Sequence, residues 1–433
     1  MIAIRRMVRI VQLVIVMSLF FSVGLRCVAG PLDSLQVAFG AAREDSTRAR
    51  LLVRMATMLQ DTAYASSLEY YAEAARLAAH GGSPDLQGWV QGALGYNHLL
   101  HNNNSAALKA IALGIQYYEQ SGNNAGLARS YNNLSIGLRR EGNNKVAAQA
   151  LAESLKRYQA EGDRGGEAMA YNNLGQIYFQ LDEYSKAANY FSEYATYSRT
   201  NGHAKAAADG ENNIGATYFE MKEYTRALNH YYVALELYDS LQNALGRAMV
   251  RDNVGLILRY LGQFRDAIGH HREAIELFDS LGDYYRKAIS LGNLSGDYRN
   301  NGDGPASLQA ARAGLAIADS MQNQELQVLL NEEVGHSLAC NGKHREANEY
   351  FTRALTLLKA QAAQCGREDI QNMRQEYGNI QEYVHGFQAD EATGGPSCLG
   401  WLGWCLVASH LVVGALGFVV ARQIARCKKK KQD

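Results

Sequence analysis

Apolar and small residues recur along this chain with helical spacing. In the stretch AYNNLGQIYFQ, Leu174 and Tyr178 are four residues apart, which places both on one face of a helix. Ala187, Phe191 and Ala195 have the same four-residue spacing and predict a second helix. Turn-prone polar residues separate the two segments. The pattern therefore predicts a pair of helices joined by a short turn.

This pair returns every 40 residues without a gap. The small residue after the aliphatic position and the one thirteen residues later would let the two helices approach closely. Each pair buries only part of its apolar surface, so neighbouring pairs must stack to complete a core. The aliphatic positions are Leu94, Leu134, Leu174, Ile214, Val254, Leu294 and Val334, and the residues expected to end the first helices are Gly142, Asp182, Gly262, Gly302 and Gly342.

The order of these positions (Leu-Gly, then an aromatic residue, then Ala, aromatic, Ala) resembles the tetratricopeptide repeat. The usual repeat has about 34 residues. The 40-residue spacing is similar to that of kinesin light chains and Leu-Gly-Asn-repeat scaffold proteins. It is also similar to the extracytoplasmic arrays of bacterial membrane-bound sensor kinases and helix-turn-helix regulators. The resemblance implies an all-α fold, a solenoid of helix-turn-helix pairs.

The array is expected to comprise about eight repeats over residues 46–365. In the first of them, residues 46–84, the second helix keeps the register at Ser67, Tyr71 and Ala74. Its first helix, with Leu52, Met55 and Leu59, is shifted by one residue. Residues 366–390 are expected to form a polar helix that caps the stack, and residues 391–397 to form a linker.

The first 29 residues have the layout of a secretory signal peptide. Arg5, Arg6 and Arg9 precede an apolar run from Ile10 to Leu25. An uncleaved signal anchor is the alternative interpretation of the same pattern.

A second apolar segment, residues 398–421, contains no charged side chain and is long enough to cross about 30 Å of hydrocarbon. Two tryptophans, Trp401 and Trp404, stand at one end. The basic tail, residues 422–433, follows at the other end and is expected to stay in the cytoplasm. The sequence therefore predicts a single-pass protein of the bacterial inner membrane, with the repeats on the periplasmic, extracytoplasmic side.

Charge is unevenly distributed. The whole chain has 43 basic and 43 acidic side chains, but residues 1–30 hold four arginines and no acid, and residues 398–433 hold six basic residues and one acid. The remaining part, residues 31–397, therefore has 33 basic and 42 acidic side chains. An acidic body is a poor ligand for a polyanion, so nucleic acid is not an expected partner.

A row of asparagines occupies the position just before the aliphatic residue: Asn133, Asn173, Asn213, Asn253 and Asn293. In tetratricopeptide proteins this position faces the concave groove, and the resemblance implies that such asparagines hold the backbone of an extended peptide. The alternative is structural, with each amide bonded to an adjacent helix. Both roles are open at this point.

Other side chains expected near the groove are Gln176, Arg140, Arg259 and Arg299. The arginines are candidates to meet a carboxylate of the ligand. Alternatively, they pair with acids of this acidic protein. The Lys, Asn, Asn, Lys, Arg set of the carboxylate clamp in co-chaperone repeats has no counterpart here.

No catalytic, cofactor or metal site is expected. His336, Cys340 and His344 have suggestive four-residue steps, but Gly342 interrupts the helix and no fourth ligand is evident. His270 and His271 lie mid-helix, the second in a packing position. Cys340 and Cys365 are predicted to be about one helix length apart, too far for a disulfide. No nucleophile–base order or phosphate-binding loop is apparent, so the chain is not expected to be an enzyme.

Two functions are therefore open. The first is a membrane-tethered scaffold or receptor whose groove binds a peptide or protein. The second is a sensor-type signal-transduction protein without its own output domain, acting through a partner kinase or transcriptional regulator. The predicted tail of twelve residues is too short to fold.

The predicted topology is testable with reporter fusions. A reporter that is active only in the periplasm should be active when fused before Pro396 and silent when fused after Asp433, because the basic flank is retained in the cytoplasm. The opposite pattern would refute the membrane assignment.

Overall fold

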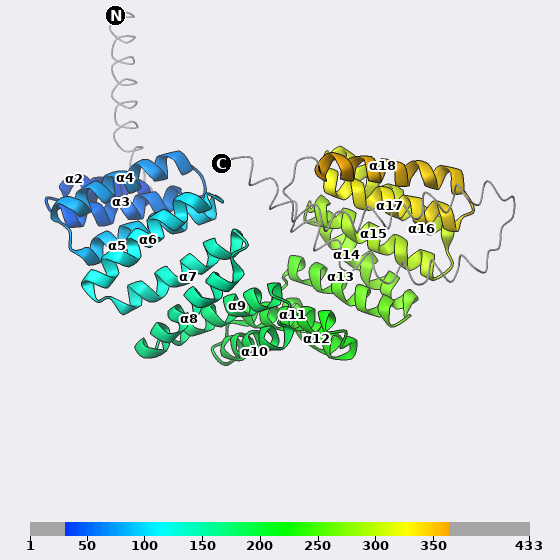
Figure 1. Cartoon of the computed structure of the whole chain (residues 1–433), viewed down its shortest axis with the longest axis horizontal. Coiled ribbons are helices and arrows are strands. Elements are labelled where there is room, and N and C mark those ends of the chain that lie inside the picture. The colour runs from blue at the N-terminus through cyan, green and yellow to red at the C-terminus, as the bar shows by residue number, and fades with distance from the viewer. Residues whose placement is uncertain (1–30, 363–433) are drawn as a thin grey trace, which may run out of the picture. The chain divides into compact units, whose positions relative to one another are not determined.

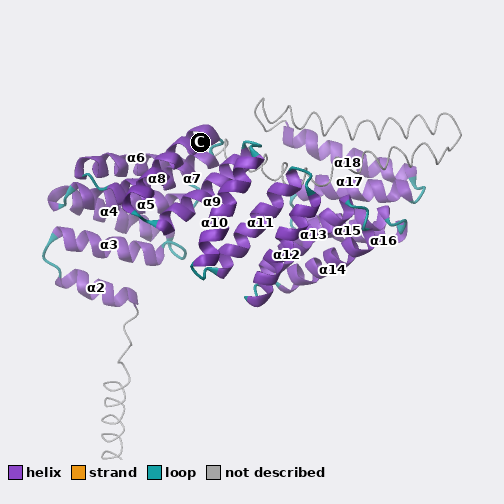
Figure 2. Ribbon diagram, turned by 90° about the horizontal axis from the view of Figure 1, so that it is seen from below, coloured by secondary structure: helices purple, strands orange, loops and turns teal. Residues whose placement is uncertain are grey.

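The computed structural model describes residues 31–362, and its regular elements in that range are all helices (Figure 1, Figure 2). No helix among them is both long and apolar enough to cross a bilayer. The predicted signal peptide, capping helix, linker, membrane segment and basic tail lie outside the described residues. The prediction of an all-α solenoid is confirmed for residues 31–362.

The chain divides into two compact units, and the boundary between Asn173 and Leu174 falls within one helix. Within unit 1, consecutive helices pack against each other in sequence order. The helices of unit 1 are α2 (Pro31–Ala41), α3 (Asp45–Leu59), α4 (Tyr64–Gly81), α5 (Pro84–Leu100), α6 (Asn104–Ser121), α7 (Asn124–Arg140), α8 (Asn144–Glu161) and the first part of α9 (Arg164–Gln180).

Unit 2 continues the same alternation. After the end of α9 it contains α10 (Tyr184–Thr200), α11 (Ala204–Glu220), α12 (Tyr224–Ser240), α13 (Ala244–Tyr260), α14 (Phe264–Ser280), α15 (Tyr284–Asn300), α16 (Gly304–Ser320), α17 (Gln324–Cys340) and α18 (His344–Ala362). We call the odd-numbered helices from α3 to α17 the leading helices and their even-numbered partners the trailing helices. From α5 onward, leading helices begin 40 residues apart, as the repeat spacing predicts.

Helix α2 was not anticipated from the sequence. Its residues Leu32, Leu35 and Phe39 pack against the apolar cluster formed by α3, α4 and α5. The guanidinium of Arg48 lies 4.6 Å from the centre of the Phe39 ring. The helix thus covers apolar surface of the first pair among the described residues.

The predicted ends of the leading helices are confirmed by left-handed backbone conformations. Gly142, Asp182 and Gly262 have φ values of 81°, 60° and 74°. After Asp182, the backbone N–H of Glu183 donates to the carbonyl of Tyr178 at 2.9 Å, which satisfies one of the last carbonyls of α9. Lys222 adopts the same conformation with φ 61°, although its residue type does not predict it.

The small residue after the aliphatic position makes room for the ring of the trailing helix. A Cβ atom added to Gly175 would lie 2.6 Å from the Phe191 ring, and one added to Gly215 would lie 2.9 Å from Tyr231. Real Cβ atoms do not approach carbon so closely. Glycine is therefore required here for close helix approach. The expected contact is confirmed, with the ring itself filling the space over the glycine.

A second glycine–ring contact joins one pair to the next and was not predicted. Tyr158 of α8 lies against Gly166 of α9, and Tyr238 of α12 lies against Gly246 of α13, eight residues farther on in each case. A side chain at either glycine would collide with the ring. At these two places glycine lets successive pairs approach closely, as it does within the pairs of Gly175 and Gly215.

One pair replaces the ring with hydroxyl groups. In α16 the ring position is Ala311, and the fully buried side chains of Ser295, Ser307 and Ser337 meet there. Their oxygens lie 2.7–3.2 Å apart and satisfy one another.

Overpacking should be costly at the predicted helix contacts. Ala187 and Ala227 are fully buried, so Ala→Leu at either position should lower the free energy of unfolding by about 1–3 kcal/mol. Chemical denaturation measures this change. The control is Glu183→Ala, at an exposed position beside the same turn, which should have little effect. Equal effects of the buried and exposed changes would show that the register is wrong.

Candidate functional site

The asparagine row lies on five leading helices, one position before the buried aliphatic residues. Asn293 is buried, and the other four asparagines are half-buried. The row comprises Asn133 on α7, Asn173 on α9, Asn213 on α11, Asn253 on α13 and Asn293 on α15.

Members of the row bond to the preceding leading helix, among them Asn293, whose Nδ2 donates to Oδ2 of Asp252 at 3.4 Å. The Nδ2 atom of Asn173 donates to Oδ1 of Asn132 at 2.8 Å. In unit 2, Nδ2 of Asn253 donates to Oδ1 of Asn212 at 3.2 Å. Each acceptor lies 41 residues before its donor, so the structural role considered from the sequence is present at these positions.

We call each hydrogen bond from the row to the preceding leading helix a ladder bond. It does not use all the donors and acceptors of the amide. An asparagine side chain has two donor hydrogens and an acceptor oxygen with two lone pairs, and a ladder bond uses one of these. The half-buried amides of Asn173 and Asn253 therefore remain chemically able to bond a ligand backbone as well. Gln176, also half-buried on α9, lies two residues after Leu174.

The three candidate arginines are all engaged within the protein. Arg140 donates to the backbone carbonyl of Leu99 and so satisfies the end of α5, the preceding leading helix. Arg299 donates to Oε2 of Glu333 at 2.9 Å. This geometry matches the alternative that arginines pair with acids, and it shows that Arg140 instead completes a helix terminus.

Arg259 is the centre of a buried charge network in unit 2. Its side chain is only 8% exposed. Its Nε donates to Oδ1 of Asp297 at 2.6 Å, and Nη2 donates to the carbonyl of Asn293 at 2.9 Å. Asp297 is fully buried. Such a pair is stable only when nearly all its polar atoms find partners.

His271 joins this network from the trailing helix α14. It occupies the ring position over Gly255 and is fully buried. Its Nδ1 lies 2.9 Å from Oδ1 of Asp252, and its Nε2 lies 3.3 Å from Oδ2 of Asp297. The expected packing role is therefore correct but incomplete, because the imidazole also lies between two carboxylates.

Two acids of these leading helices, Asp252 and Glu333, have lowered pKa values. Burial alone would raise the pKa of Asp252, but hydrogen bonds from His271 and Ser290 outweigh it and lower that pKa. At Glu333, burial is likewise outweighed, chiefly by the positive charge of Arg299, and the pKa is lowered. The available signal in the sequence was Asp252 itself, which stands where three other repeats have Asn132, Asn172 and Asn212.

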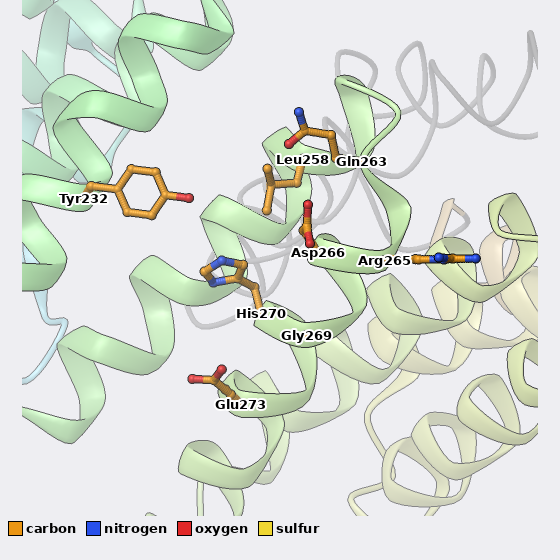
Figure 3. A pocket seen from close by; sticks show the side chains of 8 residues that line it. All are labelled: Tyr232, Leu258, Gln263, Arg265, Asp266, Gly269, His270 and Glu273. Atoms are coloured by element: carbon orange, nitrogen blue, oxygen red, sulfur yellow. The ribbon is translucent and has the colours of Figure 1, made fainter.

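A shallow hollow of about 330 Å³ lies outside the predicted site, between α12 and the start of α14 (Figure 3). Tyr232 reaches toward it from α12, and His270 and Glu273 reach toward it from α14. Gly269 contributes no side chain, and Arg265 points away. Burial, and then the charge of Arg251, lower the pKa of His270, so this imidazole is neutral at pH 7. None of the predicted binding residues lines this hollow.

The remaining histidine and cysteine candidates do not assemble a metal site among residues 31–362. His336 packs edge-on against Phe351, with its Nε2 3.5 Å from Glu332. Cys340 is exposed at the end of α17. Cys365 lies outside the described residues, so the predicted separation of the two thiols stays a prediction.

Part of the chain is similar to a known repeat family. Residues 126–200 and 204–280 match the model of the tetratricopeptide repeat. These two segments are therefore similar to tetratricopeptide repeats. No curated protein sequence matches the chain significantly.

Solved structures share the fold at low identity. The quorum sensor NprR from B. thuringiensis is 12% identical, with a TM-score of 0.57, over 75% of this chain and 92% of that one. A Rap protein in complex with competence and sporulation factor is 14% identical, with a TM-score of 0.50, over 80% and 99%. A Pyrococcus horikoshii signal-transduction ATPase with a tetratricopeptide repeat sensor is 12% identical, with a TM-score of 0.59, over 75% and 48%. At such identities the likeness concerns the fold alone.

The charge network should support unit 2. Asp297→Ala leaves the buried guanidinium of Arg259 without its carboxylate, and we expect a loss of about 3–5 kcal/mol in the free energy of unfolding. Since the pKa of Asp252 and that of Glu333 are lowered on folding, their contribution is complete above an ordinary carboxyl pKa of about 4 and disappears as the pH falls through the lowered values.

Denaturant unfolding between pH 7 and pH 2 measures both effects. Asp266→Ala, at an exposed position of α14, is the matched control and should change stability little. A stable Asp297→Ala variant would contradict a supporting role for the network.

Proposed function

We propose that this protein is a peptide- or protein-binding sensor of a signalling system, which acts through a partner kinase or transcriptional regulator. The carrying observation is the asparagine row on the leading helices, whose half-buried amides keep donor and acceptor capacity beyond the ladder bonds. Amides repeated at regular intervals suit a ligand backbone, which also repeats its donor and acceptor at regular intervals.

The comparisons support this choice over a passive scaffold. One structure of the same fold is a Rap protein bound to competence and sporulation factor, and another is a quorum sensor. Transfer of a sensing role to this chain is our proposal, as is the likeness to the arrays of membrane-bound sensor kinases. We further propose that the protein acts by binding and not by catalysis, since its sequence offers no nucleophile–base pattern.

We also propose that the array is held at the bacterial inner membrane with its repeats outside the cytoplasm. The support is the sequence alone: two apolar segments, each with basic residues on the side expected in the cytoplasm. A ligand of such an array would be met in the periplasm.

Ligand capture tests the proposed function. The tagged full chain is incubated with periplasmic extract and culture medium, and retained peptides and proteins are identified by mass spectrometry. The double variant Asn173→Ala, Asn253→Ala should capture much less of the same ligand than the unmodified chain. It should also lose about 1 kcal/mol of stability for each ladder bond.

The matched control is Asn189→Ala with Asn229→Ala, which removes two exposed amides from the trailing helices α10 and α12. This control should capture ligand normally. If the Asn173, Asn253 variant melts earlier but binds with unchanged affinity below its melting temperature, the row is only structural. If nothing is enriched over a column without protein, the proposed function is wrong.

A further inference from the structure

The leading helices of the two units differ in whether their arginines are paired with acids of the protein. In unit 2, Arg259 and Arg299 are buried against Asp297 and Glu333. A side chain committed in this way is not available to a ligand without breaking a buried pair. In unit 1 the leading helices α3, α5 and α7 together carry six arginines and only two acids, Asp45 and Asp85.

Two of those arginines, Arg50 and Arg54, are exposed on α3. They are one helical turn apart, so they lie on the same face. Of the acids in residues 31–362, none forms an ion pair with either guanidinium, although Arg48 on the same helix lies 3.8 Å from Asp45. The face opposite them, with Leu52, is buried in the core.

The register of the repeat places this face beside the asparagine positions. The leading helix of the first repeat is shifted by one residue, so Arg54 corresponds to Ala93 of α5 and then to Asn133 of α7. Arg50 corresponds in the same way to Trp89. Helices α3 and α5 are in contact, as are α5 and α7, so these positions lie on neighbouring helices (Figure 1).

The neighbouring helix α5 exposes apolar side chains on the same face. Tyr96 is 44% exposed and Leu100 is 39% exposed, and they are four residues apart. By the register, Tyr96 follows Ala93 by one turn. Large apolar side chains left exposed together beside unpaired arginines are typical of a recognition surface.

We propose that Arg50, Arg54, Tyr96 and Leu100 form a binding surface for an acidic, extended peptide with an apolar anchor residue. The two guanidinium groups hold two carboxylates, and Tyr96 with Leu100 receives the anchor. This inference rests on the proposed function and assigns it a ligand class. Charge complementarity selects the occupant, because neither guanidinium forms an ion pair with a carboxylate of residues 31–362 and Arg forms bidentate bonds with carboxylates.

The spacing of the ligand follows from the helix geometry. Arg50 and Arg54 are about 6 Å apart along the axis, at 1.5 Å per residue. An extended chain brings every second side chain to one side at about 6.6 Å. The two acids should therefore be two positions apart. Packed helices are about 8–10 Å apart, and by the register Tyr96 and Leu100 lie about 4.5 and 10.5 Å farther along the axis than Arg54. The anchor should therefore lie about four residues beyond the nearer acid, on the same side of the extended peptide.

The test uses fluorescein-labelled nonapeptides and the full chain, with binding followed by fluorescence anisotropy. The probe has two glutamates two positions apart and a leucine four positions beyond the second glutamate. One comparison peptide replaces both glutamates with lysine, and another replaces the leucine with serine. We expect the probe to bind at least about tenfold more tightly than either peptide, with an affinity that falls as salt increases.

The double variant Arg50→Gln, Arg54→Gln should bind the probe about tenfold more weakly, and so should Tyr96→Ser with Leu100→Ser. All four side chains are exposed, so these variants should melt as the unmodified chain does. The matched control, Arg265→Gln with Arg272→Gln, removes the same charge from exposed positions of α14 and should bind normally.

Equal binding of the lysine peptide, unchanged binding by the Arg50, Arg54 variant, or no binding of any probe would overturn the proposal. Self-association of the chain, in which the acidic surface of a second copy occupies this site and competes with the probe, would also overturn the proposal. Ligand capture from extract that survives loss of Arg50 and Arg54 would leave the proposed function standing and this surface refuted.

Discussion

The close approach of helices over glycine is the constraint on which the rest of this structure depends. Within a pair, the ring of Phe191 fills the space above Gly175, and between pairs Tyr158 does the same above Gly166. Neither contact tolerates a Cβ atom on the glycine. The first contact recurs at Gly215 and Gly335, and the second at Gly126 and Gly246, so the helices that carry these glycines are held at a set distance from their neighbours. Side chains before and after the buried aliphatic position are thereby presented in register.

The two units have different side chains at the positions that this register presents. In unit 2 two presented arginines, Arg259 and Arg299, are paired with Asp297 and Glu333 and removed from solvent. Buried charges fix geometry but bind nothing else without a large penalty. In unit 1 the same kind of position holds exposed Arg54 and, one turn beyond its register, exposed Tyr96. We infer that unit 1 supplies the charged contacts with the ligand, while the network in unit 2 keeps rigid the leading helices that carry Asn253 and Asn293.

The recurring features of the repeats could be predicted from the sequence. The helix pairs, their 40-residue interval, the left-handed ends at Gly142 and Asp182 and the contact over Gly175 all follow from residue types at fixed spacing. Helix α2 could not be derived in this way, since it occurs once. The left-handed Lys222 is imposed by the turn that the neighbouring helices require, and its own residue type does not predict it.

The candidate site was less predictable because it depends on pairing across repeats. Arg259 and Arg299 were identified as candidates from their positions in the repeat. Position alone could not show that each guanidinium is already paired, with Asp297 and with Glu333. Asp252 replaces an asparagine of the ladder and accepts from His271, a contact that joins two helices and leaves no local pattern. Conversely, Arg50 and Arg54 were hidden by the one-residue shift of the first repeat.

Hydrogen exchange of the full chain, measured with and without its captured ligand, tests most directly where binding occurs. Ligand contact slows exchange in the helices that it orders. The account predicts added protection in α3, α5 and α7 and little change in α13, α15 and α17, whose presented charges are already paired. Protection confined to α13, α15 and α17, or to the trailing helices, would contradict it.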